Sequence, residues 1–168
     1  MAVFVTVVVA ACASRTPAAS TRTDNVTLEA SPCYGTCPGY RVSIFADGKV
    51  NFAGTVYAVA HGQAQIAAGT ARALLRRFVN SGFADLDSNY SQQSDHCGSF
   101  ATDGPAYKLS VHSAATSHQV SFYGGCYPDP HSTRGEQDRS DYRLLRSLTA
   151  AIDSVADARG WFRQSRDR

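Results

Sequence analysis

The sequence predicts an α+β fold in which an antiparallel sheet of about five to six strands carries two helices on one face. Segments with alternating apolar and polar residues fill the first third of the chain and recur near residue 110. Two other segments repeat apolar residues with the period of a helix. A sheet covered on one face by both helices would bury all of this apolar surface in one core. The predicted order is strands, helix, hairpin, helix.

The first strands form a predicted antiparallel meander. Residues 25–30 alternate in polarity, and so do residues 40–46. The Asp-Gly pair at residues 47–48 indicates a tight hairpin, because Asp-Gly is a preferred sequence for a type I′ turn with its two positive φ angles. Alternation resumes over residues 50–60 on either side of Gly54, which predicts the return strand and one more.

A helix is predicted from Thr70, where the pattern changes to apolar residues spaced three and four apart. Thr70 is a suitable N-cap, and Gly82 is a suitable residue just past the C-terminus. Phe83 can then fold back on the last turn. The arginines of this segment fall outside the apolar stripe and are interpreted as a solvated surface.

The second half of the chain predicts a hairpin and a second helix. Residues 107–112 and 118–123 alternate again and are joined by a short polar link. His112 and His118 flank that link and are interpreted as exposed polar residues rather than metal ligands. The second helix is expected to begin at Asp141 and to end near Gly160.

The N-terminus predicts export and lipid attachment. The apolar run at residues 3–11 is too short to span a bilayer as a helix. Cys12 follows small residues, so residues 1–12 are interpreted as a lipoprotein signal segment whose cysteine carries the lipid. The segment lacks a positive charge before Val3, so the true start codon is left open. A buried first strand over residues 3–9 is the alternative.

The remaining boundaries follow from composition. Residues 13–24 are rich in Ala, Ser and Thr and are predicted to be a flexible tether. A single globular domain is expected over residues 25–162, followed by a polar tail at residues 163–168. We expect two partners. One is the membrane, which the protein contacts through its lipid anchor, and the other is another component of the cell envelope. The outer membrane, facing the periplasm, is the favoured location. The net charge of +2 gives no reason to expect nucleic acid or an acidic partner.

Four cysteines remain when Cys12 is assigned to lipid, and an even set in an exported domain indicates two disulfides. Three pairings are possible. The pairing of Cys33 with Cys37 and of Cys97 with Cys126 is favoured over the crossed ones, because Gly35 and flanking prolines permit a very small ring.

Other interpretations of these residues assign them chemistry. Cys33 and Cys37 precede a proline and, with His96 and His131, offer thiolate and imidazole ligands for copper or zinc. Thiol–disulfide exchange is a further alternative, but the segment after Cys37 is strand-like, and a helix N-terminus normally lowers the pKa of such a thiol.

The irregular polar stretch between residues 84 and 105 contains the nearest approach to an acid–base cluster. Its acids are Asp85, Asp87 and Asp95, and His96 follows the last of them. A hydrolase built around Asp95 and His96 is therefore a third interpretation, although Ser, Asn and Asp are common in any turn-rich loop. No catalytic residue, metal or cofactor is assigned from the sequence.

A family resemblance rests on the box Cys33-Tyr34-Gly35-Thr36-Cys37-Pro38-Gly39-Tyr40, with residues 27–29 before it and the Asp-Gly hairpin after it. Together they resemble a bacterial domain-of-unknown-function family, number 6438, over about residues 25–158. The resemblance implies an exported or lipid-anchored protein and supplies no catalytic or ligand residue. The sequence thus favours a non-enzymatic, lipid-anchored envelope module, with the metal or redox protein as the alternative.

Overall fold

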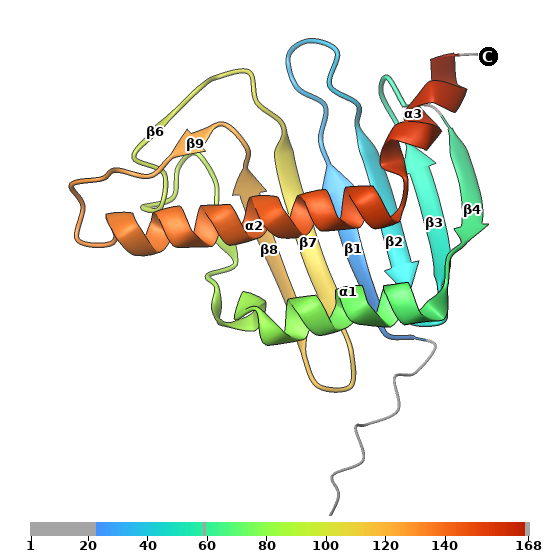
Figure 1. Ribbon diagram of the computed structural model, residues 1–168. Helices are drawn as coiled ribbons and strands as arrows, with labels where there is room; N and C mark the ends of the chain where they lie inside the picture. Colours follow the sequence, from blue (N-terminus) through green and yellow to red (C-terminus); the bar gives the residue numbers. More distant parts are fainter. Residues whose placement is uncertain (1–22, 59, 167–168) are drawn as a thin grey trace, which may run out of the picture.

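The computed structural model describes residues 23–58 and 60–166, and its architecture is α+β. Helices α1 and α2 both lie across one face of a seven-stranded sheet (Figure 1). The larger elements are β1 Asn25–Ala30, β2 Tyr40–Phe45, β3 Lys49–Gly54, β4 His61–Gln65, α1 Ala68–Asn80, β7 Ala106–His112, β8 Ser117–Tyr123, α2 Gly135–Val155 and α3 Ala158–Arg166. The shorter ones are the 3-10 helix η1 Phe83–Asp85 and strands β5 Asn89–Tyr90, β6 Ser99–Phe100 and β9 Cys126–Tyr127.

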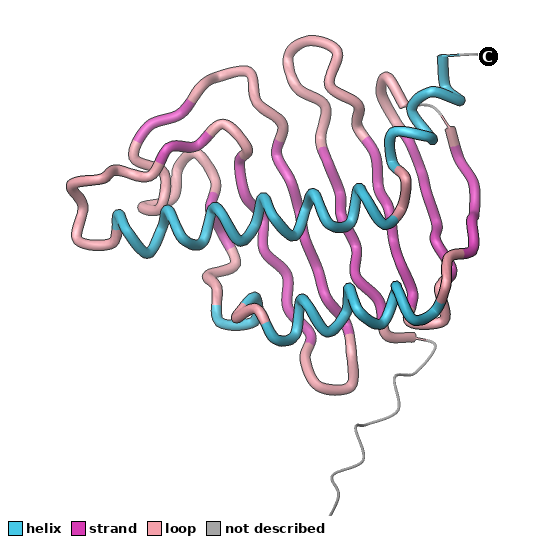
Figure 2. Tube along the Cα trace, viewed as in Figure 1, coloured by secondary structure: helices cyan, strands magenta, loops and turns pink. Residues whose placement is uncertain are grey.

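Strand β1 lies in the middle of the sheet, whose order is β4-β3-β2-β1-β7-β8-β5. It pairs antiparallel with β2 on one side and with β7 on the other. The added strand β5 runs parallel to β8, so the sheet is mostly antiparallel. Loops gather at the two ends of the strands, and residues 31–39 and 55–58 lie in loops at the same end (Figure 2).

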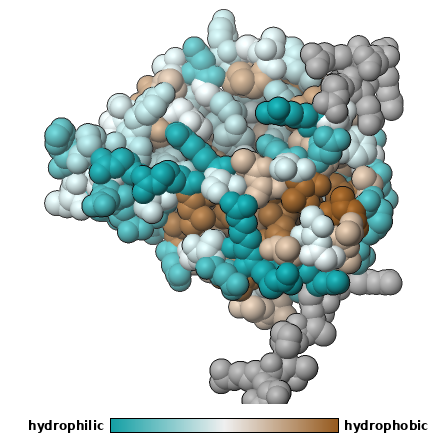
Figure 3. All heavy atoms as spheres, in the orientation of Figure 1, coloured by the Kyte–Doolittle hydropathy of each residue, from teal (hydrophilic) through white to brown (hydrophobic). Residues whose placement is uncertain are grey.

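The core lies between the sheet and the helices. Alternate residues of each central strand face the helices and are fully buried, as Val26 and Leu28 are in β1. Leu145, Leu148 and Ile152 of α2 are also fully buried. The opposite face is polar, and no helix among the described residues packs on it. Figure 3 shows that some apolar surface remains exposed between α1 and α2.

The predicted helices exist, but their limits differ from expectation. Helix α1 begins at Ala68, so Thr70 lies inside its first turn and makes no side-chain cap. Helix α2 begins at Gly135 rather than at Asp141. The residue that α2 buries in its first turn is the polar Asp138, which contacts His96. The apolar stripe of α2 therefore could not reveal where the helix begins.

Gly160 does not end α2. The helix ends at Val155, the chain turns at Asp157, which has a φ of 48°, and α3 begins at Ala158. Trp161 of α3 stacks on Phe52 of β3 with ring centroids 5.2 Å apart. The chain therefore continues as the helix α3, which packs on the core beyond Gly160, where the second helix was predicted to end.

Two predictions about the meander need correction. Residues 55–58 lie in a loop rather than in a strand, and the amide of Gly54 donates to the carbonyl of Ala60 at 2.9 Å. The hairpin after β2 is a three-residue loop in which Gly48 alone has a positive φ, of 92°. This agrees with the next most common hairpin type rather than with type I′.

The predicted lipid cysteine Cys12, the signal segment and most of the tether lie outside the described residues. Among residues 23–58 and 60–166, no helix is both long and apolar enough to cross a membrane.

Candidate functional site

Two disulfides fix the irregular parts of the fold. One joins Cys33 to Cys37, and the other joins Cys97 to Cys126, which is the pairing that the sequence favoured. Gly35 has a φ of 142°, which glycine tolerates and other residues rarely adopt, so it permits the small ring. The box is therefore a closed loop between β1 and β2, and in this form it offers no thiolate.

The box loop, residues 31–39, is held at both ends by backbone hydrogen bonds. The amide of Ser31 donates to the carbonyl of Ala106 at 2.8 Å. The amide of Gly39 donates to the carbonyl of Val56, and the amide of Thr55 donates to the carbonyl of Gly39, both at 2.8 Å. Between these anchors the side chain of Tyr34 is 91% exposed. The loop is thus a fixed rim with an exposed aromatic residue.

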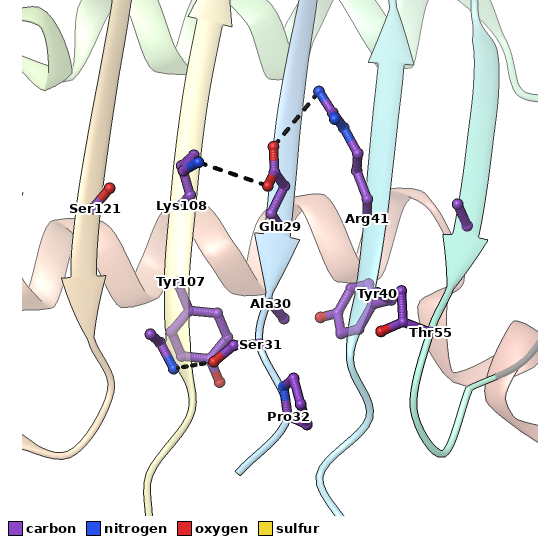
Figure 4. A pocket seen from close by; sticks show the side chains of 12 residues that line it. Glu29, Ala30, Ser31, Pro32, Tyr40, Arg41, Thr55, Tyr107, Lys108 and Ser121 are labelled. Carbon is purple, nitrogen blue, oxygen red and sulfur yellow. Dashed lines mark hydrogen bonds and ion pairs between the residues drawn. The ribbon is translucent and has the colours of Figure 1, made fainter.

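A cavity of about 570 Å³ lies beside this rim, where β1 ends. It is built from the polar, uncovered face of the sheet and draws residues from five neighbouring strands and the box loop (Figure 4). Its lining residues are Glu29, Ala30, Ser31, Pro32, Tyr40, Arg41, Ala53, Thr55, Ala106, Tyr107, Lys108 and Ser121. Small side chains such as Ala53 and Ser121 leave the space that forms the hollow.

A row of three charges crosses the cavity. Glu29 of β1 lies opposite Arg41 of β2 and Lys108 of β7 in the strand register. Its carboxylate oxygens are 3.5 Å from Arg41 Nη2 and 3.8 Å from Lys108 Nζ, and Figure 4 shows Glu29 between the two cations. One acid shared by two bases leaves a net positive charge on a partly exposed surface.

Two tyrosines flank Ala30 and form the base of the cavity near the core (Figure 4). The hydroxyl of Tyr40 donates to Asp153 Oδ1 of α2 at 2.7 Å, and Tyr107 stacks on Phe122. Burial, and then the charge of Asp153, raise the pKa of Tyr40. Burial also raises the pKa of Asp153, against the opposing effect of the Tyr40 hydrogen bond. The hydrogen bond between Tyr40 and Asp153 therefore ties the base of the cavity to α2.

A second polar cluster surrounds His96, which is 6% exposed. Its Nδ1 is 2.8 Å from Asp138 Oδ1 of α2, and its Nε2 is 3.0 Å from Asp87 Oδ2. Carboxylate oxygens accept hydrogen bonds, so each ring nitrogen of His96 faces an acceptor. The ring also stacks on Tyr90, with centroids 4.1 Å apart.

Neighbouring side chains complete this cluster. Arg134 Nη2 donates to Asp87 Oδ2 at 3.0 Å, and this hydrogen bond, assisted by the charge of His96, holds the pKa of Asp87 below its usual value. The hydroxyl of Tyr90 donates to Asp141 Oδ2 at 2.8 Å. The cluster therefore clamps the polar segment to the first turns of α2.

The structure brings together some of the residues that the sequence singled out. Asp87 contacts His96, whereas Asp95 is exposed, so a pair of Asp95 and His96 as the basis of a hydrolase is not formed. His131 is also exposed, and both nitrogens of His96 are engaged by carboxylates. Within the described part of the chain, no group of three His, Cys, Asp or Glu residues is placed to hold a metal ion.

Sequence reasoning did not identify Asp138 and Arg134. Asp138 lies in the first turn of α2, which carries no apolar pattern, and Arg134 immediately precedes that turn. The charged row was also missed. Glu29, Arg41 and Lys108 each alternate with apolar residues, and this alternation indicated that each lies on the exposed face of a strand. Only the order of the strands in the sheet places the three side chains in one row.

Comparison with known families gives one match. The family model described as Domain of unknown function (DUF6438) covers residues 24–136, which is more than half of the chain. The match ends at the start of α2, earlier than the residue 158 that the sequence resemblance suggested. A search of curated proteins finds no match.

Proposed function

The chain belongs to the DUF6438 family, and from that premise we propose that it is a non-enzymatic binding module, held at the bacterial envelope by a lipid on Cys12. The cavity beside the box loop is its binding surface. The observation that carries this proposal is the 570 Å³ hollow on the uncovered face of the sheet, lined by a charged row and edged by a disulfide-closed loop.

The charge of the surface favours an acidic partner. Arg41 and Lys108 share a single carboxylate, and both remain partly exposed. Strands two apart in a sheet are separated by about 10 Å. An extended protein segment with two acidic side chains at that spacing would neutralise both cations. We therefore propose an acidic segment of another envelope protein as the partner.

The anchor is supported by the position of the first strand. Strand β1 begins at the end of the sheet opposite the box loop (Figure 1). Twelve residues separate Cys12 from Asn25, and a flexible linker of that length spans roughly 20 Å on average. A lipid on Cys12 would then leave the box loop and cavity directed away from the membrane.

Palmitate labelling in a bacterial host tests the anchor. We expect label on the wild-type protein and none on the Cys12→Ala variant. A matched Cys33→Ala, Cys37→Ala variant should keep the label, which separates loss of the lipid site from loss of any cysteine. Label that persists in Cys12→Ala would rule out the anchor and leave the binding surface to be tested separately.

Site-specific photocrosslinking tests the surface. A photoreactive residue at Ser121, in the cavity, should give an adduct with an envelope protein, and the double variant Arg41→Glu, Lys108→Glu should lose that adduct. Ala115, in the exposed loop at the opposite end of the sheet, is the control position. The same adduct from both positions, or one that survives charge reversal, would contradict the proposed surface.

The alternative, copper or zinc binding or thiol redox chemistry at Cys33 and Cys37, requires free thiols. Mass spectrometry of the exported protein without reduction measures them. Alkylated Cys33 and Cys37 would favour the alternative, whereas a linked pair favours the binding module.

A further inference from the structure

Three arginines of α2 line a second hollow, away from the charged row. Arg139, Arg143 and Arg146 are four and three residues apart, so they project from one side of the helix. Together with Tyr127 of β9 and Tyr142 they surround a cavity of about 260 Å³. Among the described residues that line this cavity, none is acidic.

The arginines lack counter-charges within the described residues. Neither Arg139 nor Arg143 has a carboxylate oxygen within 4.0 Å there. The acids nearest in sequence on α2 are engaged elsewhere, Asp138 with His96 and Asp141 with Tyr90. Like charges four residues apart on a helix repel each other. The fold therefore holds several positive charges together without neutralising them.

Arg146 is fixed in place by the fold. Its Nη2 donates to the carbonyl oxygens of Gly124 at 3.3 Å and Cys126 at 3.2 Å. The guanidinium carbon lies 5.9 Å from the centre of the Tyr142 ring. Cys126 of β9 lines the side of the cavity that faces α2, and its disulfide to Cys97 holds that side in place. The donors of this cavity are thus partly ordered before any ligand arrives.

We propose that this arginine cavity binds a phosphate group. Guanidinium groups present planar pairs of donors that match phosphate oxygens, and such charge-assisted hydrogen bonds are stronger than neutral ones. A dianion compensates more of the three positive charges than a single carboxylate does. The exposed ring of Tyr127 offers a contact for the rest of a phosphorylated molecule, which can be a free phosphate compound or a lipid headgroup.

Calorimetric titration of the purified full chain tests the site. Inorganic phosphate is the first probe, and sodium chloride is used to keep the ionic strength constant. Arg143→Gln should weaken phosphate binding at least about tenfold, the effect of losing one charged hydrogen bond. Arg143 is exposed, so the variant should keep the circular dichroism spectrum of the wild type. Arg76→Gln is the matched control, since Arg76 and Arg72 are also four residues apart, on α1, but lie outside this cavity.

Further probes identify the source of the phosphate. Binding of glycerophosphoglycerol, the soluble phosphodiester headgroup, as tight as that of inorganic phosphate would indicate a lipid headgroup. Binding of phosphate alone would indicate a free phosphate or a phosphomonoester. Binding of neither, equal weakening by Arg76→Gln, or equally tight binding of acetate would overturn the phosphate site. None of these results depends on the lipid at Cys12 or on the cavity at Glu29.

Discussion

The box loop and the polar segment at residues 84–105 contain little regular structure and each is held by a disulfide, but the two disulfides act differently. The box loop is closed within itself by Cys33 and Cys37, and Tyr34 at its tip is exposed. The polar segment is tied to distant elements, through His96 to α2 and through Cys97 to β9. The first is thus a local device that presents a surface, and the second is part of the support of the domain.

Replacing His96 should give the largest effect on stability. His96→Ala removes the buried partner of Asp138, whose side chain is 2% exposed, and breaking a buried ion pair costs about 3 to 5 kcal/mol. Urea denaturation measures the loss of unfolding free energy. His112→Ala, in the exposed end of the hairpin, should change stability by less than about 0.5 kcal/mol. Similar values for the two variants would show that the cluster does not support the fold.

The two disulfides should differ in their contribution. Replacing Cys97 and Cys126 with serine opens a loop spanning 29 positions and should cost roughly 3 to 4 kcal/mol in the chain-entropy model. The same change at Cys33 and Cys37, which are 4 positions apart, should cost about 2 kcal/mol. Denaturation midpoints of the two double variants provide the measurement. A larger loss from the box pair would reverse the proposed division between a supporting segment and a presenting loop.

The smallest predicted effect concerns Asp153, which links the base of the box-loop cavity to α2. Burial raises the pKa of Asp153 in the folded state, so its ionisation weakens the fold as the pH rises through that folded pKa. Asp153→Asn keeps an acceptor for the Tyr40 hydroxyl and removes this titration. We expect the variant to lose part of the decline in stability that begins as the pH rises above the ordinary pKa of an aspartate and ends at the raised folded pKa. An unchanged profile of unfolding free energy against pH would contradict this effect.

The contrast between the regions also explains what could be predicted. The α+β class, the two helix stripes, the hairpin at β7 and β8 and the box were predictable, because each depends on residues close together in sequence. The polar cluster around His96 was not predictable, since Asp138 and His96 are 42 positions apart and neither belongs to an apolar pattern. Only the strand order aligns the charged row at Glu29, so its members could not be grouped from the sequence. The alternation over residues 50–60 predicted a second strand, whereas residues 55–58 lie in a loop. Short elements such as β5 depend on pairing with a distant strand rather than on their own sequence.

The central place of β1 bears on how the chain reaches this fold. Strands β1 to β4 follow one another along the chain and can pair as soon as they are made, but the other edge of β1 must wait for β7. More than 70 residues separate the two strands. Until residues 106–112 arrive, a chain folding from its N-terminus exposes one unpaired edge with the apolar side chains of Val26 and Leu28 beside it. In the interval before β7 docks, this edge of β1 is open to pairing with the edge of another chain, which is a route to aggregation.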